Sequence, residues 1–349
     1  MNILVFGAGA IGTYIGGSLL WKGHRVTFLE RPQAAKTLAE RGIYLDLTLL
    51  RHGILTFPPS SFQVSTALQE ALERSTYDLA IFALKSFDTP AAVETLRPLA
   101  TALPPLLCLS NGVENEAMLA EVLGEKVVPG TVTSAVLRLD VGKVKLEKRR
   151  GIGLASAHPA TQEWLQAFNE AALRPRLYSD AASMKWSKLL TNLVANATSA
   201  ILDMSPAEIF ADPRLYRLEM EQLREAIAVM KAQGLKVIDL PGTPVRWLAR
   251  IAQSPTFLRP IVRPFLAKGR GEKMPSLHID LYAGRRQSEV TYLNGAVVRF
   301  GERHGIPTPL NRLLNDLLLD LVQGKIPLAN FARQPQKLLP LLSGKYPKN

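Results

Sequence analysis

Three polar side chains, Lys188, Asn192 and Asn196, recur at four-residue intervals within an apolar segment near the middle of the chain. On one continuous helix this spacing places them in a single polar stripe beside an apolar one. Asn is a poor residue for a helix interior, at a cost of about 0.5 kcal/mol or more relative to Ala. A merely solvated face would more readily carry Glu, Lys or Gln, so we interpret the stripe as a site for a small polar anion. An ordinary solvated face is the alternative.

The first twelve residues contain a glycine pattern that is typical of dinucleotide binding. A short apolar strand runs directly into a Gly-x-Gly-x-x-Gly turn, which consists of Gly7, Ala8, Gly9, Ala10, Ile11 and Gly12. The first glycine permits a tight turn, the second lets a pyrophosphate approach, and the third lets helix and strand pack closely. The free N–H groups and positive dipole end of the following helix would then hold the phosphates. A strand–turn–helix without a ligand is the alternative.

Polar residues that follow later strands extend this candidate site. The second expected strand is followed by Glu30 and Arg31, and an acidic residue about 20 positions after the glycines is the expected ribose partner. Lys85 and Asn111 each follow a further apolar strand. In open α/β sheets ligands bind beyond the carboxyl ends of strands, so we expect both residues near a ribose or nicotinamide. A surface lysine and a turn-forming Asn-Gly pair are the alternatives.

Two more polar residues lie in helical patterns nearer the C-terminus. Glu289 reads as a first-turn helix carboxylate, and Ser276 as the N-cap of a helix at 276–282. Neither stands out by its pattern alone. The five histidines are dispersed and Cys108 is the single cysteine, so we expect no metal site. No Gly-x-Ser-x-Gly motif occurs, which argues against a serine hydrolase of that type.

The elements that must position these residues change near residue 180 from alternating strands and helices to helices alone. Before it, apolar strands alternate with helices, which indicates a mostly parallel, doubly wound sheet. We expect strands at 2–6, 25–29, 79–83, 106–110, 127–131, 132–138, 143–147 and 152–155, with helices at 10–22, 32–41, 90–100 and 114–122. After it, helical periodicity covers 180–203, 206–233, 285–304 and 309–323, interrupted by a proline-rich connection at 241–275. The predicted domains are therefore 1–179, of Rossmann type, and 180–349, all helical, with a ligand cleft between them.

Composition excludes several classes of protein. The chain has 349 residues and a net charge of +12, without the ~20 uninterrupted apolar residues that a membrane span needs. The first strand enters the fold at once, so we expect no signal peptide, and a single cysteine suits the cytoplasm. The basic residues are scattered, apart from a cluster at 143–150 that lacks interleaved aromatic residues. We therefore expect a basic surface that attracts an anionic cofactor and substrate, and neither nucleic acid nor membrane as a partner.

Taken in order, these motifs resemble the 2-dehydropantoate 2-reductase (ketopantoate reductase) family. The resemblance rests on the glycine turn, Ala83-Leu84-Lys85, Ser110-Asn111-Gly112, Trp186-x-Lys188 with Asn192 and Asn196, Pro275-Ser276-Leu277-x-x-Asp280, and Glu289 followed by Leu293-Asn294-Gly295. It runs from residue 1 to about 320. It implies a Rossmann-type N-terminal domain and an all-α C-terminal domain like that of 6-phosphogluconate dehydrogenase.

The resemblance also implies an activity and a set of roles. The activity is NADPH-dependent reduction of 2-dehydropantoate to (R)-pantoate in pantothenate and coenzyme A biosynthesis, by a cytoplasmic homodimer. The glycine turn would hold the pyrophosphate and Arg31 the 2′-phosphate of NADP, whereas Glu30 leaves NAD open. Lys85 and Asn111 would line the nicotinamide site, with Asn111 also touching substrate. The implied general acid is Lys188, the substrate ligands are Lys188, Asn192, Asn196 and Ser276, and Glu289 would position substrate or assist proton transfer.

Two alternatives remain open from the sequence. One is the same chemistry on another small 2-oxo or 3-hydroxy acid. The other is a non-catalytic protein that senses a dinucleotide, against which Lys188 and Glu289 argue, because a sensor needs no proton donor.

Overall fold

The computed structural model describes residues 1–254 and 272–343, and the chain divides into two compact units. The first comprises Met1–Lys185 with Leu240–Thr243, and the second comprises Trp186–Asp239 with the residues from Pro244 onward. The division falls inside helix α7 (Ala181–Leu193), a few residues beyond the boundary expected from the sequence. Residues 255–271 of the proline-rich connection and the end of the basic tail lie outside the described residues.

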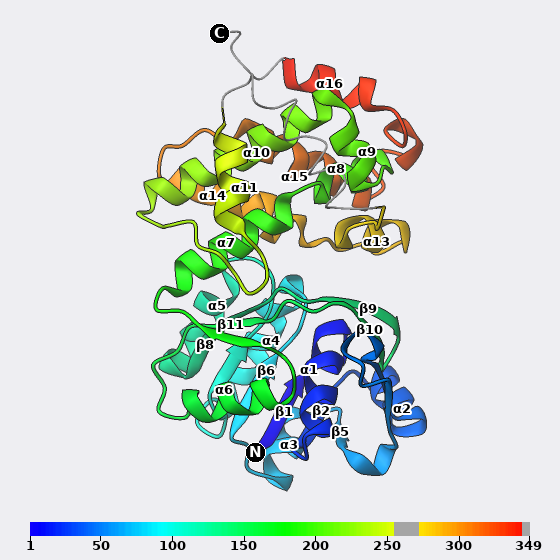
Figure 1. The fold of residues 1–349 in the computed structure, drawn as a ribbon, viewed down its shortest axis with the longest axis vertical. Helices are drawn as coiled ribbons and strands as arrows, with labels where there is room; N and C mark the ends of the chain where they lie inside the picture. The colour runs from blue at the N-terminus through cyan, green and yellow to red at the C-terminus, as the bar shows by residue number, and fades with distance from the viewer. Residues whose placement is uncertain (255–271, 344–349) are drawn as a thin grey trace. The chain divides into compact units, whose positions relative to one another are not determined.

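The first unit is built of strands and helices that alternate along the chain (Figure 1). Its strands are β1 (Asn2–Phe6), β2 (Arg25–Leu29), β3 (Ile43–Asp46), β4 (Ile54–Phe57), β5 (Gln63–Ser65), β6 (Leu79–Phe82), β7 (Leu106–Cys108), β8 (Val127–Val132), β9 (Ala135–Asp140), β10 (Lys143–Lys148), β11 (Ile152–Leu154) and β12 (Pro175–Leu177). Its helices are α1 (Ala10–Trp21), α2 (Pro32–Arg41), α3 (Leu68–Arg74), α4 (Thr89–Leu96), α5 (Asn115–Leu123) and α6 (Thr161–Glu170), with short 3₁₀ turns η1 (Thr48–Leu50), η2 (Pro59–Ser61), η3 (Ser86–Asp88), η4 (Arg97–Leu99) and η5 (Gly124–Lys126).

The main sheet has the strand order of a dinucleotide-binding fold. Its order is β12-β11-β8-β7-β6-β1-β2-β5, and the six strands from β8 to β5 are parallel. Numbered among themselves along the chain, those six read 3-2-1-4-5-6 across the sheet, which is the Rossmann order. The order reverses between β1 and β6, so the crevice for a ligand lies at the carboxyl ends of these two strands. The expectation of a doubly wound, mostly parallel sheet is confirmed.

Side-chain alternation along the central strand explains why helices cover both faces of this sheet. Ile3 and Val5 of β1 belong to a core that includes residues of α1 and α6. Leu4 and Phe6 belong to a second core with residues of α3, α4 and α5. Because successive side chains of a strand point to opposite faces, a strand that is apolar throughout must be buried on both sides.

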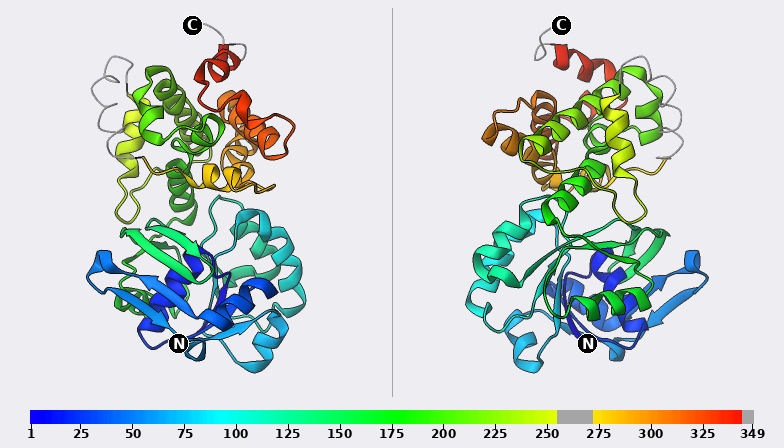
Figure 2. Two further views of the ribbon diagram at one scale, coloured as in Figure 1. Left: turned by 90° about the vertical axis from the view of Figure 1, so that its right-hand side faces the viewer. Right: turned by 60° about the vertical axis from the view of Figure 1, so that its left-hand side comes forward.

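A smaller sheet was not expected from the sequence. Its order is β4-β3-β10-β9, and β3, β9 and β10 all contact α1. Figure 2 shows the blue strands of β3 and β4 beside the green β9 and β10. The strand-like pieces expected near 132–138 and 143–147 therefore belong to a second layer over α1 rather than to the main sheet.

The second unit is helical, as expected, and is organised around the long helix α10. Besides the rest of α7, its elements are α8 (Asn196–Leu202), α9 (Pro206–Ala211), α10 (Pro213–Ala232), α11 (Val245–Gln253), α13 (Ser276–Tyr282), η7 (Glu289–Tyr292), α14 (Asn294–Arg303), α15 (Pro309–Val322), η8 (Leu328–Asn330) and α16 (Pro335–Ser343). Within the described ranges, no helix is both long and apolar enough to cross a membrane.

The expectation of one continuous helix over 180–203 is wrong. The helix ends at Leu193, Ala195 has a left-handed backbone with φ of 54°, and α8 begins at Asn196. The expected helices at 206–233 and 285–304 are likewise each divided, the latter into a 3₁₀ turn and α14. Lys188 and Asn192 therefore share a helix, whereas Asn196 starts the next one.

Candidate functional site

The glycine turn has the geometry of a phosphate cradle. Gly7 has φ of 90°, in the region that side chains rarely adopt, and a Cβ on Gly12 would lie 1.8 Å from the Gly7 carbonyl oxygen. A Cβ on Gly9, in contrast, would meet nothing within 4 Å. Gly9 is the N-cap of α1, with no side-chain cap and no acidic residue in the first turn. The turn thus leaves open space in front of a helix N-terminus, which fits the pyrophosphate of a dinucleotide.

A pocket of about 300 Å³ lies beside this turn, at the ends of β1, β2 and β6. Most of its lining is apolar, while the polar side consists of Thr66, Thr95 and three charged residues, Glu30, Arg31 and Asp88. An apolar pocket with a few placed polar groups is typical of a small-molecule site. Its place at the reversal of strand order suits the adenosine half of a dinucleotide.

The three charged residues of this pocket are bound to one another or to the turn. The Glu30 carboxylate accepts hydrogen bonds from the Ala8 N–H of the glycine turn and, at 3.0 Å, from the Arg31 N–H. The Arg31 guanidinium donates to Asp88 Oδ1 at 2.7 Å, and its side chain is 80% exposed. Glu30 is therefore attached to the phosphate cradle, and Arg31 to a second carboxylate that the sequence did not single out.

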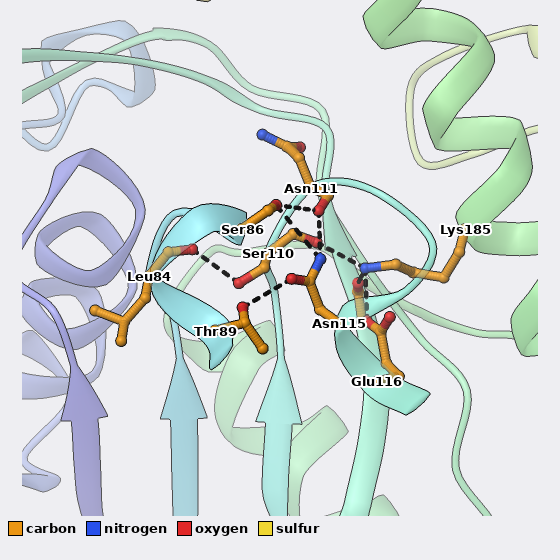
Figure 3. Close-up of polar contacts among 9 residues, drawn as sticks. Leu84, Ser86, Thr89, Ser110, Asn111, Asn115, Glu116 and Lys185 are labelled. Carbon is orange, nitrogen blue, oxygen red and sulfur yellow. Dashed lines mark hydrogen bonds and ion pairs between the residues drawn. The ribbon is translucent and has the colours of Figure 1, made fainter. Parts of the chain in front are cut away.

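The strand ends that carry Lys85 and Asn111 are tied together by a polar network (Figure 3). The Asn111 carbonyl accepts bonds from Ser86 Oγ and Asn115 Nδ2, each at 2.6 Å. A second connection between the two strand ends is the hydrogen bond that Ser110 Oγ donates to the Leu84 carbonyl at 2.8 Å. The Asn111 side chain itself extends away from this network. The backbone on both sides of Asn111 is thus fixed by this network.

A buried lysine beneath this network was missed from the sequence. Lys185 Nζ lies 2.6 Å from Glu116 Oε1 and donates to the carbonyls of Ser110 at 2.7 Å and Gly130 at 3.2 Å. The two charged side chains are only 6% and 14% exposed. The ammonium thus has two carbonyl acceptors and a carboxylate counter-ion. In the sequence Lys185 is one of many lysines, and only the fold shows that it is buried.

In the second unit, Asn196 joins two of the segments that carry predicted substrate ligands. Its Nδ2 donates to the Asn192 carbonyl at 2.9 Å, and its Oδ1 accepts from the Leu277 N–H at 3.1 Å. Leu277 follows Ser276, which is exposed and is the first residue of α13. The N-cap is Pro275, so the expectation that Ser276 caps this helix is wrong.

Lys188 and Glu289 lie in the same unit but differ in burial and in their positions on helical segments. Lys188 is half-buried and lies one turn before Asn192 on α7. Glu289 is 2% exposed and begins the 3₁₀ turn η7, so its place in the first turn of a helical segment is confirmed. Carboxylates are almost never buried to this extent unless they are paired.

The helix break before Asn196 is held by a carboxylate that the sequence did not suggest. Glu219 of α10 is fully buried and accepts from the Ala195 N–H at 2.6 Å and from Thr198 Oγ1 at 2.5 Å. It thereby satisfies orphan N–H and hydroxyl donors at the start of α8. The spacing of Lys188, Asn192 and Asn196 is thus set by a contact from another helix.

The described residues contain no group of three or more His, Cys, Asp or Glu side chains that could hold a metal ion. Cys108 is fully buried in β7.

Comparisons with known proteins agree with this arrangement. Two models of one family match the chain, ketopantoate reductase PanE/ApbA over residues 3–158 and its C-terminal part over residues 180–322. The 2-dehydropantoate 2-reductase of Pyrococcus horikoshii is 25% identical over 319 residues, which cover 90% of this chain and 95% of that protein.

Solved structures show the same fold over nearly the whole chain. A PanE/ApbA family ketopantoate reductase from Ralstonia eutropha JMP134 is 26% identical, with a TM-score of 0.76 over 93% of this chain and 99% of that one. D-mandelate dehydrogenase, solved with NADH and anilino(oxo)acetate, has a TM-score of 0.74 over 93% of this chain and 99% of that one. At 19% identity it shows the shared fold alone. Since the two family models match in order and cover most of the described chain, the protein belongs to the ketopantoate reductase PanE/ApbA family.

Proposed function

We propose that the protein reduces 2-dehydropantoate to (R)-pantoate with a reduced nicotinamide dinucleotide, on the route to pantothenate and coenzyme A. Its family membership supports an oxidoreductase of this substrate class. The observation that carries the proposal is the Asn196 side chain. It holds the Asn192 carbonyl and the Leu277 N–H together, so that two amide side chains and the Ser276 segment are gathered in one unit with Lys188.

The residues of the helical unit would bind the acid and move the proton. Asn192, Asn196 and Ser276 hold the substrate carboxylate and hydroxyl. The Lys188 ammonium stabilises the negative charge that develops on the ketone oxygen and gives it a proton. Glu289 positions the substrate or assists that proton transfer.

The residues of the first unit would hold the cofactor, which supplies the hydride when bound. The cradle at 7–12 receives the pyrophosphate, and the open space at Gly9 supports this role. Lys85 and Asn111 line the nicotinamide site, and Asn111 also contacts the substrate. The resemblance implies a cytoplasmic homodimer and the NADP form, read by Arg31, whereas Glu30 leaves NAD open.

The direct test measures oxidation of NADH and of NADPH by the purified protein with 2-dehydropantoate, followed by the loss of nicotinamide absorbance. We expect turnover with this substrate and a much lower kcat/KM with 2-oxo acids that lack its hydroxymethyl group. Equal or better turnover with another 2-oxo acid would show that this acid, and not 2-dehydropantoate, is the substrate. Tight dinucleotide binding without oxidation by any 2-oxo acid would favour a sensor.

Lys188→Ala tests the general acid, with Lys325→Ala as the matched control. Lys325 is a 65% exposed lysine of the same unit, paired with Asp320 on the surface. We expect Lys188→Ala to lower kcat by about 10²–10⁴-fold with nearly unchanged dinucleotide binding, as loss of a proton donor does. The Lys325 variant should keep its turnover. Full turnover in Lys188→Ala would remove Lys188 from this role.

A further inference from the structure

We infer that Glu30, reinforced by Asp88, makes this protein select NADH over NADPH. The inference rests on the proposed use of a nicotinamide dinucleotide, and deepens it at the adenosine pocket. The two cofactors differ only at the ribose 2′-position, which is a neutral hydroxyl in NADH and a dianionic phosphate in NADPH. The charges that surround this position therefore decide between them.

Glu30 is placed where a ribose hydroxyl is read. It follows β2 directly, and its carboxylate accepts the Ala8 N–H of the glycine turn as well as the Arg31 N–H. In Rossmann folds an acidic residue at this position accepts a hydrogen bond from the 2′-hydroxyl. Two backbone donors hold the carboxylate beside the cradle. A phosphate bound there would face a fixed like charge, and such juxtaposition is strongly unfavourable.

Arg31 is the cation that could offset this repulsion, but it already has an anionic partner. Its guanidinium lies 2.7 Å from Asp88 Oδ1, and Asp88 lines the same pocket. Glu30, Arg31 and Asp88 together carry a net charge of −1. A 2′-phosphate that recruits Arg31 must take it from Asp88 and leave two carboxylates near the dianion.

Glu30 and Asp88 differ in how firmly they are held, and this difference decides which of them contributes more to cofactor selectivity. The Arg31–Asp88 pair is largely exposed on the arginine side, and exposed pairs are weak, so the arginine can leave it at small cost. Glu30 is half-buried and is held by backbone donors. Glu30 is therefore the main determinant of selectivity, and Asp88 the secondary one.

The test is the equilibrium Kd of NADH and of NADPH, from nicotinamide fluorescence or calorimetry without substrate. We expect the unaltered protein to bind NADH at least about 10-fold more tightly, and Glu30→Gln, which keeps the shape of the side chain, to reduce that ratio about 10-fold by improving NADPH binding. Asp88→Asn should improve NADPH binding by about 2–3-fold, as for an exposed charge. Glu40→Gln, an exposed carboxylate on α2 paired with Lys36, is the matched control and should leave both constants unchanged.

Two results would overturn the inference. One is tighter binding of NADPH by the unaltered protein, and the other is a selective loss of NADPH binding in Arg31→Ala. Since no substrate is present, the result is separate from the proposed reaction. An NADH preference without any reductase activity would support the inference and refute the proposed function, whereas binding of neither dinucleotide would refute both.

Discussion

The buried ion pair between Lys185 and Glu116 allows a quantitative test of how the Asn111 strand end is held. Lys185→Met keeps much of the side-chain volume and removes the charge. It leaves the Glu116 carboxylate, 14% exposed, without its ammonium, and it removes the donor to the Ser110 and Gly130 carbonyls. Breaking a buried pair in this way costs about 3–5 kcal/mol, a large part of the about 5–15 kcal/mol that stabilises a typical domain.

The assay is urea unfolding followed by circular dichroism and tryptophan fluorescence. With an m-value of about 3 kcal/mol/M, the loss corresponds to a fall of the midpoint by about 1–2 M. The loss of stability comes mainly from the Glu116 carboxylate that is left buried without a counter-ion. Lys185→Met combined with Glu116→Gln should therefore recover a large part of the lost unfolding free energy.

Lys126 provides a matched control within the same unit. Its Nζ donates to three backbone carbonyls, those of Ala100, Thr101 and Leu103. Unlike Lys185, it is half-exposed and has no carboxylate among these acceptors. Lys126→Met should therefore cost about 1 kcal/mol, as for ordinary hydrogen bonds near the surface. An equal loss in both single variants, or no recovery in the double variant, would refute the reasoning.

Three further outcomes follow from the described contacts. Gly12→Ala should abolish dinucleotide-dependent stabilisation in a thermal shift assay, because its Cβ would lie 1.8 Å from the Gly7 carbonyl oxygen. Gly9→Ala should keep the fold of the protein without cofactor and weaken only dinucleotide binding. Normal dinucleotide binding by Gly12→Ala would contradict this prediction. Glu219→Gln should destabilise the protein by about 1–3 kcal/mol in chemical unfolding, since it weakens the bonds that hold the start of α8; an unchanged midpoint would argue against this capping role. Burial raises the pKa of the Cys108 thiol, so it should react with a thiol reagent near neutral pH only after unfolding, and labelling of the native protein at the rate of a free thiol would show that this site opens.

The parts of the fold that follow local rules could be predicted from the sequence. The strand, glycine turn and helix at the start of the chain were found because each carries its own signal, and the parallel sheet followed from the alternation. The smaller sheet was missed because its pairing is remote. Strand β3 pairs with β10, about a hundred residues later, and the residues of β4 are only half-buried or exposed. Neither feature leaves a clear periodicity in the sequence.

The candidate site was accessible from the sequence only in part. Residue types and motif order pointed to Lys188, Asn192 and Asn196, but not to the break between the last two. Ala195 is a good helix former, and its left-handed backbone accompanies a hydrogen bond from its own N–H to Glu219, a residue of another helix. The Arg31–Asp88 pair and the buried Lys185 likewise depend on contacts between distant segments.

The division of the chain inside α7 has a consequence for dissecting the protein. A fragment that ends at residue 179, where the sequence changes character, would lack Lys185 and so leave Glu116 without its charge partner. It would also lack the returning segment Leu240–Thr243, in which the Pro241 carbonyl accepts a bond from Thr133 Oγ1 at 2.7 Å. The nucleotide-binding half is therefore not a contiguous stretch of sequence. An independently expressed nucleotide-binding unit should extend through Lys185 and carry a grafted 240–243 segment. Exchange of this unit between relatives should use the same boundaries.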